Sequence, residues 1–233
     1  MRLTVCLPTY NERDNLEPMI RALEDVIPAD GRVLVIDDDS PDGTGAVADE
    51  LAAALPWLDV LHRSEKQGLG RAYVAGFQRA LADGAELIVE MDCDFSHDPA
   101  DVPRLVAAVE EGADVALGSR YVPGGRVRNW SLVRRAISRA ASIYTRALLM
   151  PIRDPTGGFK CFRREVLEAI DLDRVHGAGY VFQVETTYRA LQHGFRVVEV
   201  PITFSERTAG SSKMSRAIVL EAMWRVPLLR LRR

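Results

Sequence analysis

Short apolar runs alternate along the first half of the chain with longer segments whose apolar residues recur at helical spacing. The short runs predict strands at residues 3–7, 33–36, 59–61, 87–91 and 115–118. The longer segments predict helices at residues 16–27, 45–55, 70–82 and 100–111. Apolar strands separated by helices are typical of a mostly parallel sheet with helices on both faces. We therefore expect an α/β fold whose ligands bind beyond the carboxyl ends of the strands.

The second half is less regular and begins with a long amphipathic helix predicted at residues 130–150. Its apolar positions, with arginines on other faces, are Leu132, Val133, Ile137, Ala140, Ala141, Tyr144 and Leu148. After it we expect a turn at 154–158, a strand at 159–163, a helix at 181–193, a strand at 196–200, a polar loop at 205–215 and a last helix at 216–226. No repeat or linker separates a second unit, so residues 1–233 are expected to form one domain.

Charge is divided unevenly between the two halves, although the formal net charge is only −3. Residues 1–119 hold 24 acidic and 9 basic side chains, a net of −15, whereas residues 120–233 hold 9 acidic and 21 basic, a net of +12. Residues 120–146 contain seven arginines and no Asp, Glu or Lys. This segment favours an anionic partner such as phosphate or a lipid headgroup, with a solvated basic face as the alternative. No nucleic acid is expected, because the pI is only about 5.9.

The sequence contains neither a membrane span nor a secretory signal by the usual criteria. No run approaches the roughly 18 consecutive apolar residues that a span requires, and the apolar start at residues 3–7 is too short for a signal peptide. We therefore expect a cytoplasmic location. The three cysteines Cys6, Cys93 and Cys161 are widely separated, which predicts reduced thiols rather than a disulfide framework or a zinc site.

Asp92 and Asp94 directly follow the strand predicted at residues 87–91, where nothing about packing calls for charge. Two carboxylates at this spacing favour Mg²⁺ or Mn²⁺, which bridges the phosphates of a nucleotide and neutralises a leaving diphosphate. Loop or cap aspartates are the structural alternative. His97 lies in the same loop, but the sequence supports no Ser/His/Asp or Cys/His arrangement around it.

Two more loops are expected at the same end of the sheet. Residues 37–40 form an acidic cluster after the second strand, in which we assign Asp38 to the ligand, whereas Asp42 is assigned to the following turn and helix cap. Residues 8–12 end the first strand with Pro-Thr-Tyr-Asn-Glu, which offers an aromatic ring for a base and polar groups for its edge. An ordinary turn between strand and helix is the alternative there.

Basic side chains of the second half are candidates for holding a phosphate. Arg134 and Ser138 lie one helical turn apart, and Arg120 is supplied from the end of the fifth strand. Arg207 and Lys213 belong to a Gly- and Ser-rich loop that could close over an anion, with solvated surface charge as the alternative for Lys213.

Taken in order, these motifs resemble those of the inverting family 2 glycosyltransferases, and within them the polyprenol (dolichol) phosphate mannosyltransferases. The resemblance covers nearly the whole chain and rests on residues 7–12, 36–44, 91–97, 118–121, 130–138, 179–183 and 207–213. It implies a nucleotide-binding GT-A fold. Residues 1–119 would be its nucleotide- and metal-binding half, and residues 120–233 its acceptor-binding half with interfacial helices.

The resemblance also implies transfer of mannose from GDP-mannose to a polyprenyl or dolichyl phosphate, whose own oxygen attacks the sugar and gives a β-linked product. The residues implied around the donor are Pro8, Tyr10, Glu12, Ile36, Asp38, Asp92, Cys93, Asp94, Arg207 and Lys213. Asp92 and Asp94 would hold Mg²⁺ or Mn²⁺, and the residues implied around the lipid phosphate are Arg120, Arg134 and Ser138. Of these, Asp94, Arg120 and Arg134 are expected to act in catalysis.

Many relatives carry membrane spans or rely on a small membrane subunit. For this chain the expectation is peripheral attachment to the cytoplasmic face of an anionic membrane, through the arginine-rich helix and the cationic residues 228–233, with a separate anchoring protein as a possible partner. Three alternatives remain open: a UDP-glucose-dependent polyprenyl-phosphate glucosyltransferase, a haloacid-dehalogenase-like phosphatase with Asp92 as nucleophile, and a non-catalytic membrane adaptor.

Overall fold

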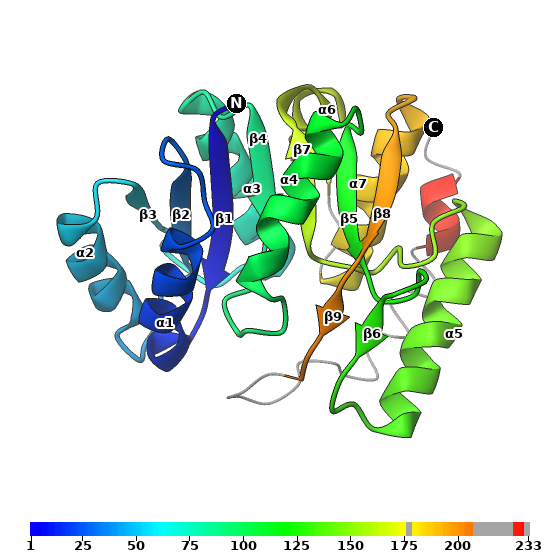
Figure 1. Cartoon of the computed structure of the whole chain (residues 1–233), viewed down its shortest axis with the longest axis horizontal. Coiled ribbons are helices and arrows are strands. Elements are labelled where there is room, and N and C mark those ends of the chain that lie inside the picture. The colour runs from blue at the N-terminus through cyan, green and yellow to red at the C-terminus, as the bar shows by residue number, and fades with distance from the viewer. Residues whose placement is uncertain (176–178, 207–225, 231–233) are drawn as a thin grey trace.

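The structure, a computed structural model, describes residues 1–175, 179–206 and 226–230. Its strands are β1 (Leu3–Thr9), β2 (Arg32–Asp37), β3 (Leu58–His62), β4 (Leu87–Glu90), β5 (Val115–Ser119), β6 (Arg126–Val127), β7 (Lys160–Arg163), β8 (Val197–Pro201) and β9 (Thr203–Phe204). Its helices are α1 (Arg13–Glu24), α2 (Thr44–Ala54), α3 (Leu69–Ala82), α4 (Val102–Glu110), α5 (Leu132–Leu148), α6 (Arg164–Ala169) and α7 (Tyr180–Gln192), with short 3-10 turns η1 (Pro99–Asp101) and η2 (Leu172–Arg174). Helices cover the sheet from both sides (Figure 1).

The central sheet has the strand order β3-β2-β1-β4-β7-β5-β8. All neighbouring strands are parallel except at β7, which runs antiparallel to both β4 and β5. The sequence predicted a strand at residues 159–163, and the structure adds that it is inserted between β4 and β5. The α/β fold with a mostly parallel sheet is confirmed.

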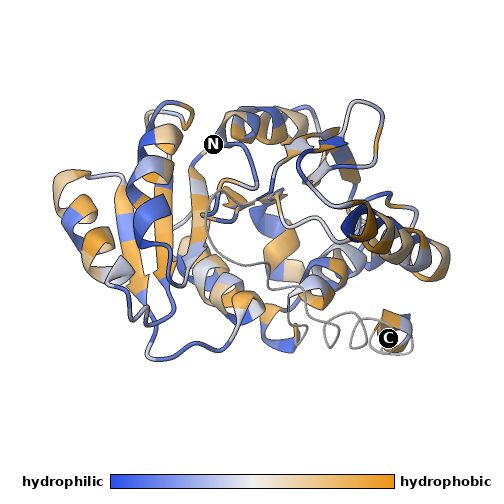
Figure 2. Ribbon diagram, turned by 90° about the horizontal axis from the view of Figure 1, so that it is seen from below, coloured by the Kyte–Doolittle hydropathy of each residue, from blue (hydrophilic) through white to orange (hydrophobic). Residues whose placement is uncertain are grey.

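Two apolar layers hold the helices against the sheet. On one face α1, α2 and α4 pack over alternate residues of the central strands, such as Val5 and Val35, and on the other face α3, α6 and α7 pack over Cys6, Leu34 and Ile88. The apolar strands between amphipathic helices are visible in the hydropathy colouring (Figure 2). Because every side chain of β1 is buried on one face or the other, the strand is a continuous apolar run in the sequence.

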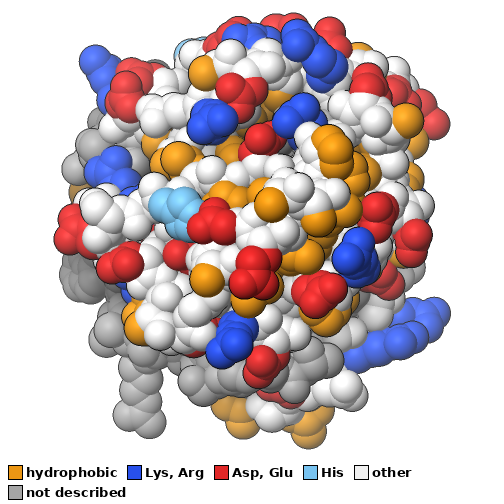
Figure 3. Space-filling model, turned by 90° about the vertical axis from the view of Figure 1, so that its left-hand side faces the viewer, with side chains coloured by type: hydrophobic (Ala, Val, Ile, Leu, Met, Phe, Trp, Pro, Cys, Tyr) orange, Lys and Arg blue, Asp and Glu red, His pale blue; other side chains and the backbone are white. Residues whose placement is uncertain are grey.

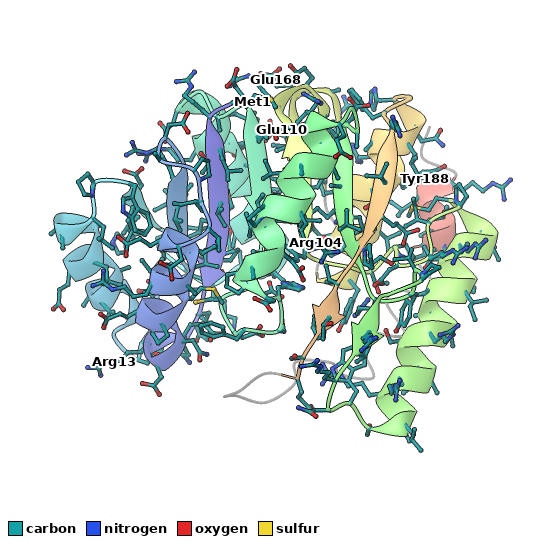
Figure 4. The ribbon with its side chains drawn as sticks, viewed as in Figure 1. Met1, Arg13, Arg104, Glu110, Glu168 and Tyr188 are labelled. Atoms are coloured by element: carbon teal, nitrogen blue, oxygen red, sulfur yellow. The ribbon has the colours of Figure 1, made fainter. Side chains whose placement is uncertain are left out.

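The end of the sheet where β1, β2 and β4 finish is opposite the end that carries the amino terminus. Met1, Glu110 and Glu168 lie at the amino end, whereas Arg13 begins α1 at the carboxyl end (Figure 4). A small parallel pair, β6 with β9, extends beyond β5 and β8 on this side of the molecule. The carboxyl end is therefore bounded by the βα loops and by the β6, β9 and α5 extension.

Helix α5 confirms the predicted long helix, and the structure shows which of its faces is buried. Its buried residues are Ser138, Ser142 and Thr145, whereas Leu132 is 80% exposed and Val133 is 68% exposed. The helix therefore packs against the protein through small polar side chains and turns its apolar face outward. Such an orientation is unusual for a helix on a globular protein, whose apolar stripe ordinarily faces the core.

Several elements differ from the sequence-based expectation. The pair β6 and β9, the short helix α6 and the turn η2 were not predicted, because none of them contains an apolar run of strand length or a repeat at helical spacing. The predicted loop at 205–215 and helix at 216–226 fall almost entirely outside the described residues. Within the described ranges, no helix is long and apolar enough to cross a membrane.

Candidate active site

A cavity of about 320 Å³ opens at the carboxyl end of the sheet, where the loops after β1, β2 and β4 meet the start of α5. Its lining combines acidic side chains from the first half with basic and aromatic ones from the second. The lining residues are Pro8, Thr9, Tyr10, Glu12, Asp38, Lys66, Gly68, Leu69, Ala72, Asp92, Cys93, Asp94, Ser96, His97, Arg120, Trp130, Arg134, Thr156, Gly158, Gly179, Tyr180, Gln183 and Phe204.

One side of the cavity carries the residues that the sequence assigned to a nucleoside. The ammonium of Lys66 lies 3.5 Å from the centre of the Tyr10 ring, and Asp38 is buried and paired with Arg63. Burial raises the pKa of the Asp38 carboxyl, and the positive charge of Arg63 opposes that rise. Glu12 accepts a hydrogen bond from the Asn15 amide at 2.8 Å. An aromatic ring, a cation, the buried carboxylate of Asp38 and the half-buried carboxylate of Glu12 thus line one recess.

Ile36, which the resemblance also placed near the donor, does not line this cavity. Its side chain is fully buried in the core layer that contains Ala72 and Tyr73. A β-carbon added at Gly76 would lie only 2.8 Å from the Ile36 δ-methyl carbon, so Ile36 packs closely against α3. Ile36 therefore belongs to the core packing next to the cavity and not to its lining.

The loop after β2 divides its aspartates between structure and cavity. Asp42 accepts hydrogen bonds from the backbone N–H groups of Thr44 and Arg13 at 3.0 and 3.2 Å, which is the turn-holding role predicted for it. Asp37 accepts from the hydroxyl of Ser40 at 2.6 Å and does not line the cavity. Asp38 is therefore the aspartate of this cluster that reaches the cavity.

Asp92 and Asp94 enter the cavity from the loop that follows β4. The Tyr73 hydroxyl donates to Asp92 Oδ1 at 3.1 Å, and the Ser96 backbone N–H donates to Asp94 Oδ1 at 2.9 Å. Phe95, which follows Asp94, has a left-handed backbone, with φ of 57°, which gives the loop its sharp turn. The two carboxylates are thus held by hydrogen bonds at the floor of the cavity.

The donor set suits a hard divalent cation that is shared with a substrate. No group of three or more His, Cys, Asp or Glu side chains in the described residues could enclose a metal by itself. Mg²⁺ is ordinarily bound through one or two carboxylates together with substrate phosphates and water. Asp92 and Asp94 fit that pattern. Between them Cys93 is a buried neutral thiol, because burial raises its pKa.

A buried ion pair lies beneath this loop. Lys160 Nζ on β7 donates to Glu90 Oε1 on β4 at 2.9 Å, both side chains are completely buried, and Lys160 also contacts Gln183. Burial raises the pKa of Glu90 to about 7, with Lys160 opposing the rise. The pair ties the antiparallel strand β7 to the strand that ends at the cavity floor.

The basic side of the cavity contains Arg120 and Arg134. Arg120 is buried and donates to Asp154 through Nε at 2.7 Å and to Thr156 through Nη2 at 2.9 Å. Burial alone would lower the pKa of Arg120, but the adjacent Asp154 carboxylate raises it. Arg120 is consequently a fixed cation at the cavity wall.

Arg134 lies over the ring of Trp130, with 4.2 Å between its central carbon and the ring centre, and its Nη1 donates to Glu206 at 3.0 Å. The buried Arg134 Nε and Trp130 Nε1 have no hydrogen-bond partner among the described residues. Buried N–H groups normally have a partner, so these two donors beside the cavity are suited to a bound anion.

Ser138 was predicted to lie beside Arg134 at the phosphate site, but it does not line the cavity. Its hydroxyl is on the buried face of α5 and accepts from the Tyr121 hydroxyl at 2.7 Å. Arg207 and Lys213 lie outside the described residues. Sequence reasoning missed Lys66, Trp130 and Asp154 as contributors. A signal for Asp154 was available, since it is the first acidic residue after the arginine-rich segment.

Comparison with known proteins assigns the chain to a family. Residues 4–171 match the family described as "Glycosyl transferase family 2". The chain is 53% identical over 97% of its length to "Polyprenol monophosphomannose synthase" of Mycolicibacterium smegmatis, covering 85% of that protein. It is 50% identical over 96% of its length to "Undecaprenyl-phosphate mannosyltransferase" of Micrococcus luteus, covering 91% of that protein.

Solved structures agree with the fold. The mannosyltransferase PcManGT from Pyrobaculum calidifontis, in complex with GDP-Man and Mn²⁺, aligns over 91% of this chain and 58% of its own, with a TM-score of 0.65 and 21% identity. Glucosyl-3-phosphoglycerate synthase from Mycobacterium tuberculosis, in complex with phosphoglyceric acid, aligns over 98% of this chain and 79% of its own, with a TM-score of 0.72 and 19% identity. The motifs, the fold and these relatives together establish that the chain is a glycosyltransferase and belongs to glycosyl transferase family 2.

Proposed function

We propose that the protein transfers mannose from GDP-mannose to a polyprenyl phosphate and releases GDP, with inversion to a β-linked product. The observation that carries the proposal is the single cavity in which Asp92 and Asp94 face a fixed cation, Arg120, and the donors of Arg134 and Trp130. The names of the relatives from M. smegmatis and M. luteus support a polyprenyl-phosphate acceptor and a mannosyl donor.

The donor would occupy the acidic side of the cavity. Tyr10 would stack on the base, Asp38 and Glu12 would accept hydrogen bonds from base or ribose, and Asp92 and Asp94 would hold Mg²⁺ or Mn²⁺ at the diphosphate. Bound there, the metal supplies charge stabilisation for the departing GDP. Arg207 and Lys213 are proposed to add positive charge to the same diphosphate.

The acceptor phosphate would occupy the basic side. A phosphate ester is ionised at neutral pH, so its oxygen attacks the anomeric carbon without a protein base. The chain must then align nucleophile and leaving group and compensate their charges. Trp130 Nε1 and Arg134 Nε, which lack partners among the described residues, would donate to the acceptor, and Arg120 would supply a cation fixed by Asp154.

The membrane is proposed to supply the acceptor. The outward apolar face of α5, beside its arginines, supports peripheral attachment to an anionic membrane at the cytoplasmic side, with a separate anchoring protein as a further partner. Membership of family 2 argues against the alternative of a haloacid-dehalogenase-like phosphatase, because those phosphatases have an unrelated fold.

The test is incubation of the purified protein with polyprenyl phosphate, Mg²⁺ and either radiolabelled GDP-mannose or radiolabelled UDP-glucose. We expect mannose label in the organic-soluble lipid, dependent on both the metal and the acceptor. Glucose label in the lipid without mannose label would assign the chain to the glucosyltransferase alternative and refute the proposed donor.

A further inference from the structure

A second cavity, also of about 320 Å³, shares Arg120 with the cavity of the proposed active site. It is formed by the turn after β5, the strand β6 and the first turns of α5. The side chains and backbone that line it are those of Arg120, Tyr121, Gly125, Arg126, Val127, Arg128, Arg135 and Arg139. Five of these eight residues are arginines and none is acidic, so the described lining carries only positive charge.

Four of these arginines lack the compensation that Arg120 has. No salt bridge among the described residues involves Arg126, Arg128, Arg135 or Arg139. All four are exposed, and the charged group of Arg139 lies 5.7 Å from the centre of the Tyr121 ring. Like charges gathered around one cavity repel each other, which an anion in the cavity would relieve. By contrast, the end of the molecule at α2 and β3 carries acidic and basic side chains side by side (Figure 3).

The backbone fixes the positions of these arginines. The N–H groups of Arg126 and Arg128 donate to the carbonyls of Ile202 and Phe204 at 2.9 and 2.8 Å, which pairs β6 with β9. A β-carbon at Gly125 would lie 2.5 Å from the Ser119 carbonyl oxygen, so the turn before β6 requires glycine. Arg135 and Arg139 are four residues apart and therefore share one face of α5. The fold therefore places the backbone of all four arginines around the cavity.

The chemistry of the cavity matches a phosphate attached to a lipid. Guanidinium groups bind phosphate oxygens through paired N–H donors. Next to the cavity, α5 exposes the apolar side chains Leu132, Val133 and Ile143, and small polar side chains fill its inner face. A soluble anion would make no contact with that apolar face, whereas a phospholipid would place its phosphate among the arginines and its acyl chains along the helix.

We propose that this arginine cavity binds the phosphate of an anionic phospholipid headgroup, at a site separate from that of the acceptor phosphate. Arg120 lines both cavities and marks the boundary between them. The inference rests on the proposed membrane attachment but not on the identity of the sugar donor. It gives the attachment a specific phosphate site in place of a diffuse basic surface.

The test measures binding to phosphatidylcholine vesicles with and without roughly 20% phosphatidylglycerol, an anionic lipid that gives the vesicle a negative surface potential. Arg135→Gln/Arg139→Gln should lower affinity for the anionic vesicles by about 30-fold, the effect of two arginines at a charged surface. The matched control, Arg146→Gln/Arg153→Gln, removes the same charge from exposed residues outside the cavity and should lower affinity by about threefold at most. Equal losses in the two variants would overturn the proposal.

Two further measurements distinguish a lipid phosphate from a free phosphate and check that the variant is folded. Tight calorimetric binding of soluble glycerol phosphate, lost in Arg135→Gln/Arg139→Gln, would assign the cavity to a free phosphate and overturn the lipid assignment. Transfer to polyprenyl phosphate in detergent micelles should stay near the wild-type rate in that variant, which excludes misfolding. If the wild-type protein itself made no mannolipid, the proposed function would fail while the vesicle result would still decide the headgroup site.

Discussion

Asp94 is nearly buried, is held by the Ser96 N–H, and lies with Asp92 at the cavity floor. Asp94→Asn keeps the shape of the side chain but removes the negative charge that would hold a divalent metal ion at the donor diphosphate. We expect transfer to fall by about two orders of magnitude or more, as when a key electrostatic group is lost. Asp98→Asn is the control, because Asp98 caps η1 in the same loop by accepting from the Ala100 N–H. Equal losses of the steady-state transfer rate in both variants would show that transfer depends on the conformation of this loop and not on the charge of Asp94.

Trp130 presents a buried indole N–H without a partner among the described residues. Trp130→Phe retains an aromatic ring for Arg134 to stack on but removes this donor. We expect the KM for polyprenyl phosphate to rise about tenfold, the effect of one hydrogen bond to a charged group, with the KM for GDP-mannose unchanged. Kinetics with each substrate varied in turn checks this, and a change confined to the GDP-mannose KM would place the indole on the donor side instead.

At the residue scale, the sequence located most side chains that converge on the cavity. Tyr10, Asp38, Asp92 and Asp94 follow strand ends, and strand ends of a parallel sheet meet at one place. Ser138 was assigned to the phosphate because it lies one helical turn from Arg134, but it belongs to the small polar face of α5, which is buried against the protein.

At the scale of elements, the link between β4 and β7 depends on the buried pair of Glu90 and Lys160. Lys160→Met leaves the Glu90 carboxyl buried without its cation, so we expect the free energy of unfolding to fall by about 3–5 kcal/mol. Glu90→Gln/Lys160→Met should recover much of this loss, since no charge is then buried alone. Urea unfolding of the three proteins measures the difference. A double variant no more stable than Lys160→Met would contradict this account.

Helix α5 is the element whose exposed side chains bear most directly on the proposed membrane attachment. Leu132 and Val133 are 80% and 68% exposed, so Leu132→Glu/Val133→Glu should leave the melting temperature nearly unchanged. Binding to vesicles should nevertheless weaken, because apolar area is no longer transferred into the lipid and two negative charges are added. A large fall in melting temperature would show instead that the helix packs its apolar face within the protein.

The sequence predicted the long elements well and the short ones poorly. Strands β1 to β5 are largely apolar runs of four to seven residues, and helices α1 to α4 repeat their apolar positions over nine to fourteen residues, whereas β6 and β9 contain two residues each. The antiparallel direction of β7 could not be predicted from the hydrophobic pattern, because a buried strand shows the same apolar run whichever way it pairs with its neighbours.

At the scale of the whole molecule, the acidic first half and the basic second half meet at one cavity. The net charges of −15 and +12 in the two halves indicated this division from the sequence alone. The fold brings Asp92 and Asp94 from one half into the same cavity as Arg120, Trp130 and Arg134 from the other. A donor and an acceptor phosphate bound there would be placed for a single displacement.

The most direct measurement of this central claim is the anomeric configuration of the mannolipid made from α-linked GDP-mannose. One attack by the acceptor phosphate on the face opposite GDP predicts a purely β-linked mannosyl phosphate, read from the one-bond carbon–hydrogen coupling at the anomeric carbon. An α-linked product would contradict direct displacement within the cavity.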